Sequence, residues 1–354
     1  MISAYKGKNA IVTGGLGFIG SNLAIRLVKL GARVSILDAE VPGCGANEAN
    51  LRPVWGNATL MRCDLGEPER FAGALESADV IFNLAGEISH SHSMKFPERD
   101  AALNAISQLR FLQACARWNP GIRVVYAGTR QIYGRPQYLP VDENHPAAPV
   151  DFNGIHKNAA VQYHLLHAAL GQLDTVVLHL TNVYGPRMAL NAGCQGFLGT
   201  YLKRLLLRQP LEIFGDGCQL RDPLYVDDAV DAFLLAGAVP RVASRVYNVG
   251  GPAALSLRKI AKIAHDLAGG PVPVFRPFPA SRKSIDIGSY WTDSSRIGRE
   301  LGWYPVTGFV EGMARALAFY QEDFESYVGP GVCDGECGLE QDMEPAAARA
   351  ATQP

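Results

Sequence analysis

The chain has 354 residues, of which 48% are hydrophobic and 19% charged, and its formal net charge is −1. This balance predicts a globular protein with ample core and argues against a broad basic surface for nucleic acid or membrane lipid. We see no signal peptide and no run of about 20 apolar residues, so we expect a cytoplasmic protein with no membrane partner. The cysteines are scattered and odd in number, which favours reduced thiols. Cys333 and Cys337 have the wrong spacing for a zinc knuckle, and no metal is expected.

The first half of the chain alternates short apolar runs with amphipathic segments. "NAIVTGG" predicts a strand and a glycine turn, and "FIGSNLAIRLVKLG" predicts a helix that ends at Gly31. "RVSILDAE", "ADVIFNLAG", "IRVVYAGT" and "DTVVLHLTNVYG" predict further strands, while residues 101–118 and 158–169 predict helices. Strands that alternate with helices of this length imply right-handed crossovers and a parallel sheet.

After Pro186 the alternation loosens, and shorter helical and strand-like runs follow. We therefore expect an α/β protein in two parts: a Rossmann-type, doubly wound parallel sheet and a smaller C-terminal α/β substrate domain. The expected ranges are 1–185 for the first part, with residues of about 222–250 returning to it, and 186–327 for a substrate-binding cap. Residues 328–354 are rich in Gly, Pro, Ala and acids, and they predict a flexible tail.

The turn "TGGLGFIG" points to a dinucleotide site. Gly14, Gly17 and Gly20 have GxxGxxG spacing between a strand and a helix, which allows a sharp turn, close approach of a pyrophosphate and tight packing. Asp38 ends the next strand, 18 residues after Gly20, where a carboxylate accepts hydrogen bonds from ribose hydroxyls and repels a 2′-phosphate. Asp64 follows a third strand and could receive the adenine amine. This pattern favours NAD over NADP.

Seven motifs in this order, "TGGLGFIG", "LDAE", "RCDL", "FNLAG", "YAGTRQIYG", "TNVYGPR" and "IFGDGCQLRDPLYVDDAVDAFLLA", resemble the extended short-chain dehydrogenases. More narrowly, residues of about 8–320 resemble the NAD-dependent nucleotide-sugar epimerases and dehydratases. The resemblance implies that NAD is held by the residues of the glycine turn and of the following strand ends. These are Gly14, Gly17, Phe18, Ile19, Gly20, Asp38, Asp64, Leu65, Leu84, Ala85 and Gly86, with Asn104 bracing the site and Lys157 binding the nicotinamide ribose.

The same resemblance implies a nucleotide-diphosphate sugar as substrate. Thr129 falls on the active-site Ser/Thr, and Ser93 would lie beside the sugar. Contacts to the substrate are expected from Glu87, Ser93, Thr129, Arg130, Gln131, Asn182, Arg187, Arg221 and either Arg282 or Lys283. Read independently of kinship, Arg221 follows a turn and has the fork geometry that suits a diphosphate, although an ion-paired structural role would fit equally.

Two departures from the family pattern bear on the chemistry. Family dehydratases carry an acidic pair just after the active-site Thr, whereas this chain has Arg130 and Gln131, which neither donate an acidic proton nor abstract one at neutral pH. The larger departure is Asn153, four residues before Lys157, at the position of the YxxxK tyrosine. A carboxamide cannot act as the base, although it can position a sugar hydroxyl or a water.

Several groups are candidates to replace that base. The loop "EISHSHSMKFP" supplies Glu87, His90 and His92, and an imidazole that titrates near neutrality is the preferred surrogate, with His92 favoured because it adjoins Ser93. Lys157 could serve if burial lowered its pKa. Tyr133 and Tyr184 are further candidates that normally pack, and His156 is expected to point away from the cofactor.

These observations predict an NAD-dependent C4 epimerase in which Thr129 binds the C4 oxygen and the sugar passes through a 4-keto form. One alternative is a reductase, an oxidase or another modified-sugar enzyme of the same family. The other is a degenerate NAD-binding sensor or scaffold, which the missing tyrosine favours and the diphosphate-binding features oppose. The apolar helices 101–118 and 158–169 could pair with their copies across a two-fold axis, so a homodimer is expected, although they could equally just cover the sheet.

Overall fold

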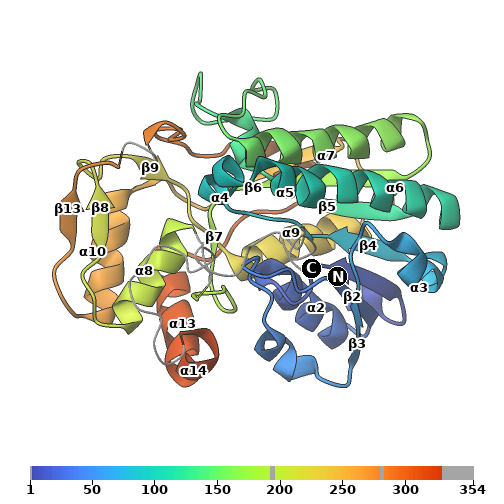
Figure 1. Cartoon of the computed structure of the whole chain (residues 1–354), viewed down its shortest axis with the longest axis horizontal. Coiled ribbons are helices and arrows are strands. Elements are labelled where there is room, and N and C mark those ends of the chain that lie inside the picture. Colours follow the sequence, from blue (N-terminus) through green and yellow to red (C-terminus); the bar gives the residue numbers. More distant parts are fainter. Residues whose placement is uncertain (1, 192–195, 280–282, 329–354) are drawn as a thin grey trace, which may run out of the picture.

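The centre of the molecule is a seven-stranded parallel sheet with the strand order β11-β6-β5-β4-β1-β2-β3, seen in a computed structural model that describes residues 2–191, 196–279 and 283–328 (Figure 1). The strands are β1 (Asn9–Thr13), β2 (Arg33–Asp38), β3 (Ala58–Arg62), β4 (Val80–Asn83), β5 (Arg123–Thr129), β6 (Asp174–Leu180) and β11 (Val246–Val249). The chain winds outward in both directions from β1 and β4. A doubly wound sheet places its ligand crevice at the carboxyl ends of those strands. The predicted Rossmann-type fold class is confirmed.

Helices cover both faces of the sheet (Figure 1). On one face α2 (Phe18–Lys29) packs beside α9 (Val226–Ala238), and on the other α3 (Ala72–Ser77), α6 (Ser107–Trp118) and α7 (Phe152–Ala169) form a layer. Alternate residues of the strands enter the two cores: Val12 and Phe82 pack with the first layer, Ile11 and Ile81 with the second. Burial on both faces explains why the central strands are nearly continuous apolar runs.

Two predicted helices have different bounds in the structure. The helix expected over 101–118 is preceded by α5 (Pro97–Ala101) and widened by a π-helical turn at Ala102–Ile106 before α6 begins. The helix expected from residue 158 begins at Phe152, because the side chain of Asp151 caps it by accepting a hydrogen bond from Gly154 N at 2.7 Å. Both differences lie at polar positions that later prove to belong to the site.

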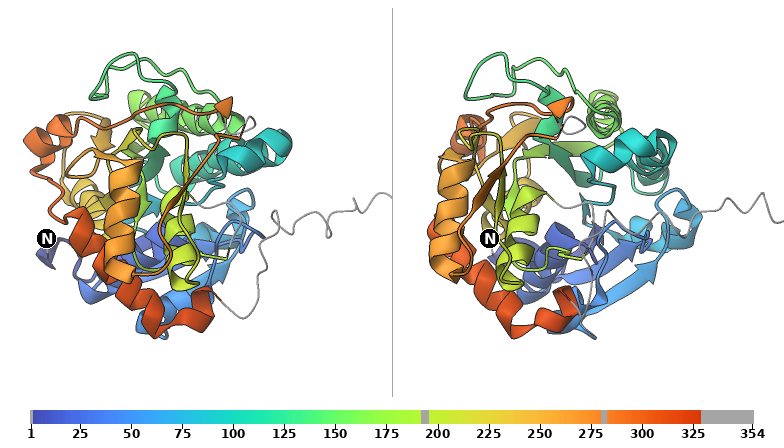
Figure 2. Two further views of the ribbon diagram at one scale, coloured as in Figure 1. Left: turned by 90° about the vertical axis from the view of Figure 1, so that its left-hand side faces the viewer. Right: turned by 60° about the vertical axis from the view of Figure 1, so that its left-hand side comes forward.

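The remaining elements gather mainly beside the sheet, and Figure 2 turns this side toward the viewer, with α8 and α10 next to one another. They are β7 (Val183–Tyr184), α8 (Phe197–Leu206), β8 (Glu212–Phe214), β9 (Leu220–Arg221), β10 (Leu224–Tyr225), β12 (Leu255–Ser256), α10 (Leu257–Ala268), β13 (Val274–Arg276), α12 (Ser295–Leu301), α13 (Phe309–Glu322) and α14 (Phe324–Tyr327), and we call this group of elements the cap. Elsewhere lie α1 (Ile2–Tyr5), α4 (His90–Lys95) and short 3-10 helices at Glu48–Val54, Pro68–Phe71 and Arg130–Tyr133. Between these segments the chain returns to the sheet, where β11 pairs with β6.

Some predicted features fall on residues that the structure does not describe, namely Arg282, the Cys333 and Cys337 pair, and the tail beyond Val328. Within the described ranges, no helix has the length and apolar character needed to cross a membrane. The same residues contain no group of three or more His, Cys, Asp or Glu side chains placed to hold a metal ion.

Candidate active site

The glycine turn connects β1 to α2. Gly14 has a φ of +66°, and a Cβ there would lie 3.0 Å from the backbone of Ala85 on the neighbouring β4 end. A Cβ on Gly20 would lie 2.3 Å from Gly14 O, and one on Gly17 would lie 3.1 Å from the same atom. No side chain caps the N-terminus of α2, so its first amide groups and the helix dipole are available to an anion. The turn therefore has the form of a pyrophosphate site.

The acids at the next strand ends are already engaged with backbone amides. Asp38 is buried and accepts hydrogen bonds from Leu16 N and Glu40 N, both at 2.9 Å. Burial raises the pKa of its carboxyl, and these two bonds oppose that shift. Asp64 accepts a bond from Gly66 N at 2.7 Å. Each carboxylate retains lone pairs for a ribose hydroxyl or an adenine amine, so the expected roles remain compatible with this geometry.

The β4 end, at Leu84 to Gly86, is fixed by a buried polar chain. Thr13 Oγ1 accepts hydrogen bonds from the backbone amides of Leu84 and Ala85 at 3.0 and 3.1 Å, and it donates to Asn83 Oδ1 at 2.8 Å. Gln108 continues the chain by accepting from Asn83 Nδ2 and donating to Ala85 O. The "NLAG" segment is therefore bonded to α6 through Gln108, which fixes its backbone beside the glycine turn.

The last residue of that segment, Gly86, lies against Asn104 and Lys157. A Cβ on Gly86 would lie 2.5 Å from Asn104 Oδ1 and 2.6 Å from Lys157 Nζ, and Gly86 has a φ of +150°. Asn104 lies in the π-helical turn, is fully buried, and neither polar atom of its amide has a hydrogen-bond partner. An orphaned buried amide is costly unless a water or a ligand completes it. This group fits the predicted site for a nicotinamide ribose.

Burial lowers the pKa of Lys157 to about 8, against an ordinary value of 10.5, although the charges of Asp100, Glu87 and Cys44 oppose the shift. Between these two pH values the unfolded chain holds a proton that the folded protein lacks, so stability at this residue rises with pH. We expect the unfolding free energy of the wild type to improve relative to that of Lys157→Met between pH 8 and 10. Urea unfolding without added cofactor measures this, and parallel pH dependences of the two proteins would contradict it.

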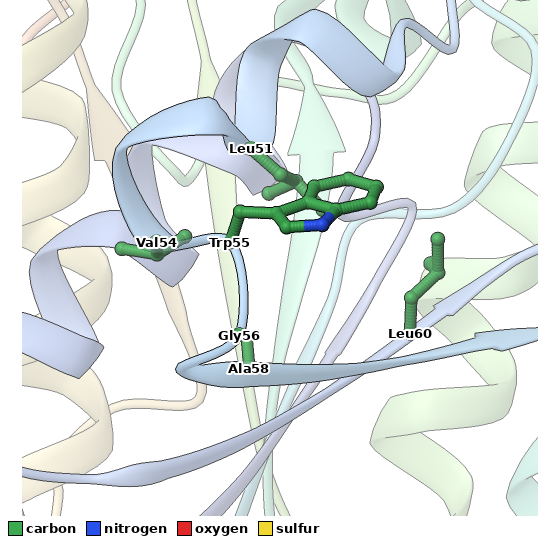
Figure 3. Close-up of a pocket in the computed structure, with 6 residues that line it drawn as sticks. All are labelled: Leu51, Val54, Trp55, Gly56, Ala58 and Leu60. Atoms are coloured by element: carbon green, nitrogen blue, oxygen red, sulfur yellow. The ribbon is translucent and has the colours of Figure 1, made fainter.

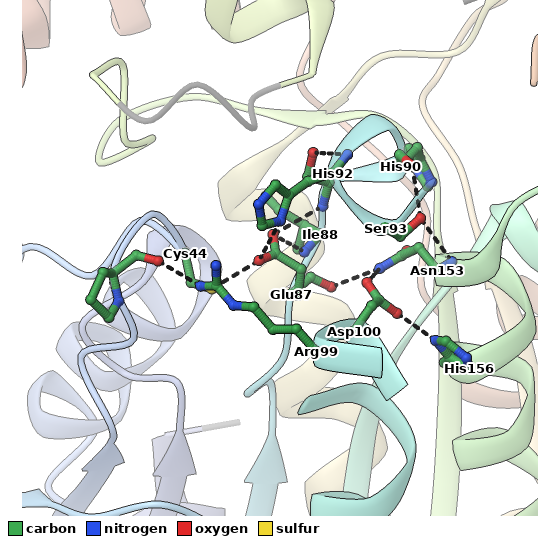
Figure 4. A network of polar contacts seen from close by, with 12 residues as sticks. Cys44, Glu87, Ile88, His90, His92, Ser93, Arg99, Asp100, Asn153 and His156 are labelled. Carbon is green, nitrogen blue, oxygen red and sulfur yellow. Dashed lines mark hydrogen bonds and ion pairs between the residues drawn. The ribbon is translucent and has the colours of Figure 1, made fainter. Parts of the chain in front are cut away.

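Asn153 is held by a network that uses both hydrogens of its amide (Figure 4). Its Nδ2 donates to Asp100 Oδ2 at 2.9 Å and to Glu87 O at 3.1 Å, and its backbone N–H donates to Ser93 Oγ. Asp100 is 2% exposed, and its other oxygen pairs with His156 Nδ1 at 2.8 Å. The two acceptors fix the orientation of the amide, so that Oδ1 is the atom left to accept a further hydrogen bond.

His92 and Glu87 form an imidazole–carboxylate pair in the same network (Figure 4). His92 Nδ1 lies 3.7 Å from Glu87 Oε2, and the buried His92 Nε2 has no hydrogen-bond partner. Glu87 is 2% exposed and also accepts hydrogen bonds from Cys44 Sγ and from the Ile88 and Ser89 amides. The other loop imidazole, His90, has its Nδ1 3.1 Å from Oδ2 of Asp151, the residue that caps the N-terminus of α7. Both loop imidazoles therefore face a buried carboxylate through Nδ1. They differ in exposure, since the His90 side chain is 38% exposed and that of His92 is 16% exposed, and only Glu87, the partner of His92, directly follows Gly86.

The segment after β5 carries Thr129, Arg130 and Gln131. Thr129 Oγ1 accepts a hydrogen bond from Gln131 N, which leaves its hydroxyl hydrogen for another acceptor. Gln131 is buried and donates to Asp151 Oδ2 at 2.8 Å, so it helps to hold the side chain that caps the N-terminus of α7. Arg130 stacks on the Tyr290 ring at 4.8 Å and donates to Asn182 Oδ1 at 3.1 Å. Neither residue after Thr129 supplies an acid.

Arg221 lies close to Arg130. Its Nη1 donates to Leu220 O and Gly288 O, and its Nη2 lies 3.7 Å from Asp286. Burial and the nearby charge of Arg130 lower the pKa of Arg221 to about 10. Two desolvated guanidinium groups that repel one another are compatible with the expected binding of an anion, and Asn182 is linked to them through Arg130.

Other predicted residues have structural partners. Arg187 has a backbone φ of +74°. Its guanidinium donates to Asn22 Oδ1 on α2 and to Asn50 O, and it lies over the Phe319 ring of α13, so it connects the cap to α2. Lys283 is exposed. The hydroxyl groups of the two candidate tyrosines are also taken, since Tyr133 donates to Asn248 Oδ1 and Tyr184 to Phe309 O. These contacts give no support to Arg187 as a substrate ligand or to either tyrosine as a base.

Asp100, Cys44 and Tyr290 belong to the site but were not predicted. Asp100 stands four residues before Asn104, and this spacing places two polar side chains on one helix face, a signal that the sequence did contain. Cys44 reaches Glu87 from the loop after β2, and Tyr290 reaches Arg130 from the cap. No local pattern marks either residue, because each arrives from a segment distant in the sequence.

A separate hollow lies beside the edge strand β3 (Figure 3). Its lining is Leu51, Val54, Trp55, Gly56, Ala58 and Leu60. None of these side chains is titratable or charged, so the hollow offers no group for acid–base chemistry or for binding a phosphate.

Comparison with known proteins agrees with this geometry. A model of the NAD-dependent epimerase/dehydratase family matches residues 10–250. The chain belongs to this family. As a family member it is an NAD-dependent enzyme of nucleotide sugars, and the glycine turn, Gly86, Asn104 and Lys157 fit the cofactor.

Relatives and solved structures match nearly the whole chain. UDP-glucose 4-epimerase of Mycolicibacterium smegmatis is 32% identical over 88% of this chain and 98% of its own, and a putative UDP-glucose 4-epimerase of Methanocaldococcus jannaschii is 29% identical over 87% and 96%. The structure of UDP-glucose 4-epimerase from Thermotoga maritima with UDP-glucose has a TM-score of 0.81 and 27% identity, covering 90% of this chain and all of that one. A dTDP-glucose 4,6-dehydratase from Streptomyces venezuelae with NAD bound has a TM-score of 0.79 and 26% identity, covering 89% and 97%. Both reaction types therefore occur among its relatives.

Proposed function

We propose that this chain is a nucleotide-sugar 4-epimerase in which the His92–Glu87 pair manages the proton at the C4 oxygen. The observation that carries the proposal is the unpartnered, buried His92 Nε2, whose other ring nitrogen faces Glu87. A carboxylate beside Nδ1 stabilises the imidazolium that forms when Nε2 accepts a proton. Glu87 also directly follows Gly86, next to Lys157, so the pair adjoins the cofactor site.

The chain's residues divide the work at the sugar. NAD, when bound, supplies the hydride acceptor at C4 and the donor for the reverse step. Thr129 donates its hydroxyl hydrogen to the C4 oxygen, and His92 Nε2 takes the proton from the C4 hydroxyl and later returns it. Lys157 holds the ribose, and Asn153 Oδ1 accepts a hydrogen bond from a sugar hydroxyl or a water. Arg221 and Asn182 hold the diphosphate.

Epimerisation is favoured over 4,6-dehydration by the partners of Arg130 and Gln131. Elimination of water needs an acid for the leaving hydroxyl and a base for the C5 proton. Gln131 is an amide that donates to Asp151, and Arg130 is a guanidinium that is bound to Asn182. A sensor that binds NAD alone is disfavoured because His92 and Arg130, outside the cofactor site, each keep a buried polar atom without a partner, which is costly in a protein that binds no substrate.

Turnover of a panel of nucleotide sugars in deuterated water, followed by NMR, tests the proposal. We expect inversion at C4 without incorporation of deuterium, because the hydride returns internally. Deuterium at C3 or C5 would indicate enolisation, and a 4-keto-6-deoxy product would indicate dehydration; either result would replace the proposed reaction. NAD binding without turnover of any sugar would favour a sensor.

We further propose a cytoplasmic homodimer formed by the outer faces of α6 and α7. Ile106, Ile155 and Leu166 on or next to these helices are 46 to 56% exposed, and exposed apolar side chains that gather in one patch mark protein–protein interfaces. Light scattering of the purified chain should give twice the monomer mass of 38.2 kDa, and Ile155→Glu should halve it.

A further inference from the structure

Arg130 has a hydrogen-bonding group that nothing in the described structure uses. Its Nη2 donates to Asn182 and its plane lies on Tyr290, but the buried Nη1 has no hydrogen-bond partner. No carboxylate of the described ranges forms an ion pair with it, whereas Arg221 has Asp286 at 3.7 Å. The charges of Asp222, Asp286 and Asp151 act favourably on Arg130, but burial outweighs them and lowers its pKa, so a bound anion would offset the remaining desolvation cost.

The position of Arg130 next to Thr129 indicates which end of the sugar it reads. In a pyranose ring C1, which carries the diphosphate, and C4 lie at opposite ends, while C6 is attached to C5 beside C4. Under the proposed function Thr129 contacts the C4 oxygen, so we place the next residue, Arg130, beside the substituents of C3 and C5. Of these, only C6 can be present as a carboxylate. Arg221, which is tethered from the cap by Leu220 O and Gly288 O, is then the group for the diphosphate.

We propose that the substrate is a nucleotide-activated uronic acid whose C6 carboxylate is bound by Nη1 of Arg130. A planar guanidinium suits a carboxylate, and a charge-assisted bond in a desolvated site is stronger than one between neutral groups. The charge of Arg130 contributes, after burial, to the lowered pKa of Arg221, and an anionic group bound at each guanidinium would relieve this repulsion. This inference rests on the proposed function for the placement of C4.

Calorimetric titration of the NAD-loaded protein tests the assignment without turnover. The probes are matched pairs, UDP-glucose with UDP-glucuronate, UDP-galactose with UDP-galacturonate, and GDP-mannose with GDP-mannuronate, together with UDP and GDP. We expect the acid of at least one pair to bind at least about tenfold more tightly than its neutral partner. Arg130→Gln should abolish that preference and weaken UDP or GDP much less than the acid, because the bond to Asn182 is lost but Arg221 still holds the diphosphate. Arg130→Lys, which keeps the charge and the stacking stem, should retain part of the preference.

Arg221→Gln is the contrasting variant, and it should weaken both members of a pair and the free nucleotide alike. Arg70→Gln, an exposed arginine paired with Glu67, should change neither and controls for the loss of one positive charge. If Arg130→Gln weakens UDP or GDP as much as the acid, Arg130 reads the diphosphate and the proposal is wrong. It is equally wrong if no acid binds more tightly than its neutral partner, or if the preference survives in Arg130→Gln.

Turnover measured on the same samples separates this inference from the proposed function. An acid that binds through Arg130 but is not inverted at C4 upholds the carboxylate site and refutes the epimerase. Inversion of a neutral sugar with no preference for its acid refutes the carboxylate site and upholds the epimerase.

Discussion

His92→Asn is expected to lower kcat by about 10²- to 10⁴-fold, the usual contribution of a positioned general base. The physical reason is that His92 Nε2 is the buried imidazole nitrogen left free beside Glu87, and asparagine keeps the polarity but cannot take a proton. Steady-state kinetics with the sugar found by NMR measure the loss. NAD binding should be unchanged, since His92 belongs to α4 and not to the glycine turn.

His265→Asn is the matched control for this change. His265 on α10 has the same separation from a carboxylate, with its Nδ1 3.7 Å from Asp266 Oδ1, but it lies in the cap and its Nε2 is 3.2 Å from Gly270 O. It should retain full activity. Glu87→Gln should lower kcat less than His92→Asn, because the imidazole remains and only the stabilisation of its charged form is lost. Full activity of His92→Asn would leave His90, which faces Asp151, and Lys157 as the candidate bases.

Asn153→Tyr, which restores the family's motif, is expected to lower activity and stability rather than raise them. The site is 1% exposed, and both hydrogens of the amide are bound to Asp100 and to Glu87 O. A tyrosine would leave the buried Asp100 short of a donor, at a cost of about 1–3 kcal/mol, and its ring would overpack the site at a cost of about 1–3 kcal/mol. Urea unfolding and turnover, measured together, test both consequences.

Gln321→Tyr places the same ring on the exposed side of α13, away from the site and from the proposed dimer face, and should change neither property. If Asn153→Tyr instead gains activity without loss of stability, the site is a decayed copy of the usual one and the network around Asp100 has no catalytic purpose. An Asn153→Asp variant adds information, because a second carboxylate facing Asp100 should be destabilising at neutral pH and should recover as the pH falls and one of the two is protonated.

Much of the cofactor site could be predicted because its signals are local. Gly14, Gly17 and Gly20 are required by a sharp turn between a strand and a helix, and the structure shows the close backbone approaches that exclude a Cβ there. Asp38 and Thr129 end strands whose apolar runs are evident in the sequence. Parallel strands bring their carboxyl ends to one edge, so the order of the motifs implied their proximity.

The catalytic base could be narrowed but not chosen from the sequence. His90 and His92 have the same local pattern, and only the folded chain shows that one faces the cap of α7 while the other faces Glu87. The π-helical turn at Asn104 was also missed. So was the earlier start of α7, although Asp151, three residues before Gly154, is a local capping signal. Arg187, expected at the substrate, instead ties the cap to α2.

The sequence by itself determined the sheet, the glycine turn and the family, because hydrophobic periodicity and backbone sterics act between residues close in the chain. Tertiary structure decided what the unusual residues do. Asn153 is oriented by an aspartate 53 positions earlier, and Arg130 is stacked on a tyrosine 160 positions later. Hydrogen bonds and desolvation depend on which groups meet in space, and that is fixed only when distant segments pack together.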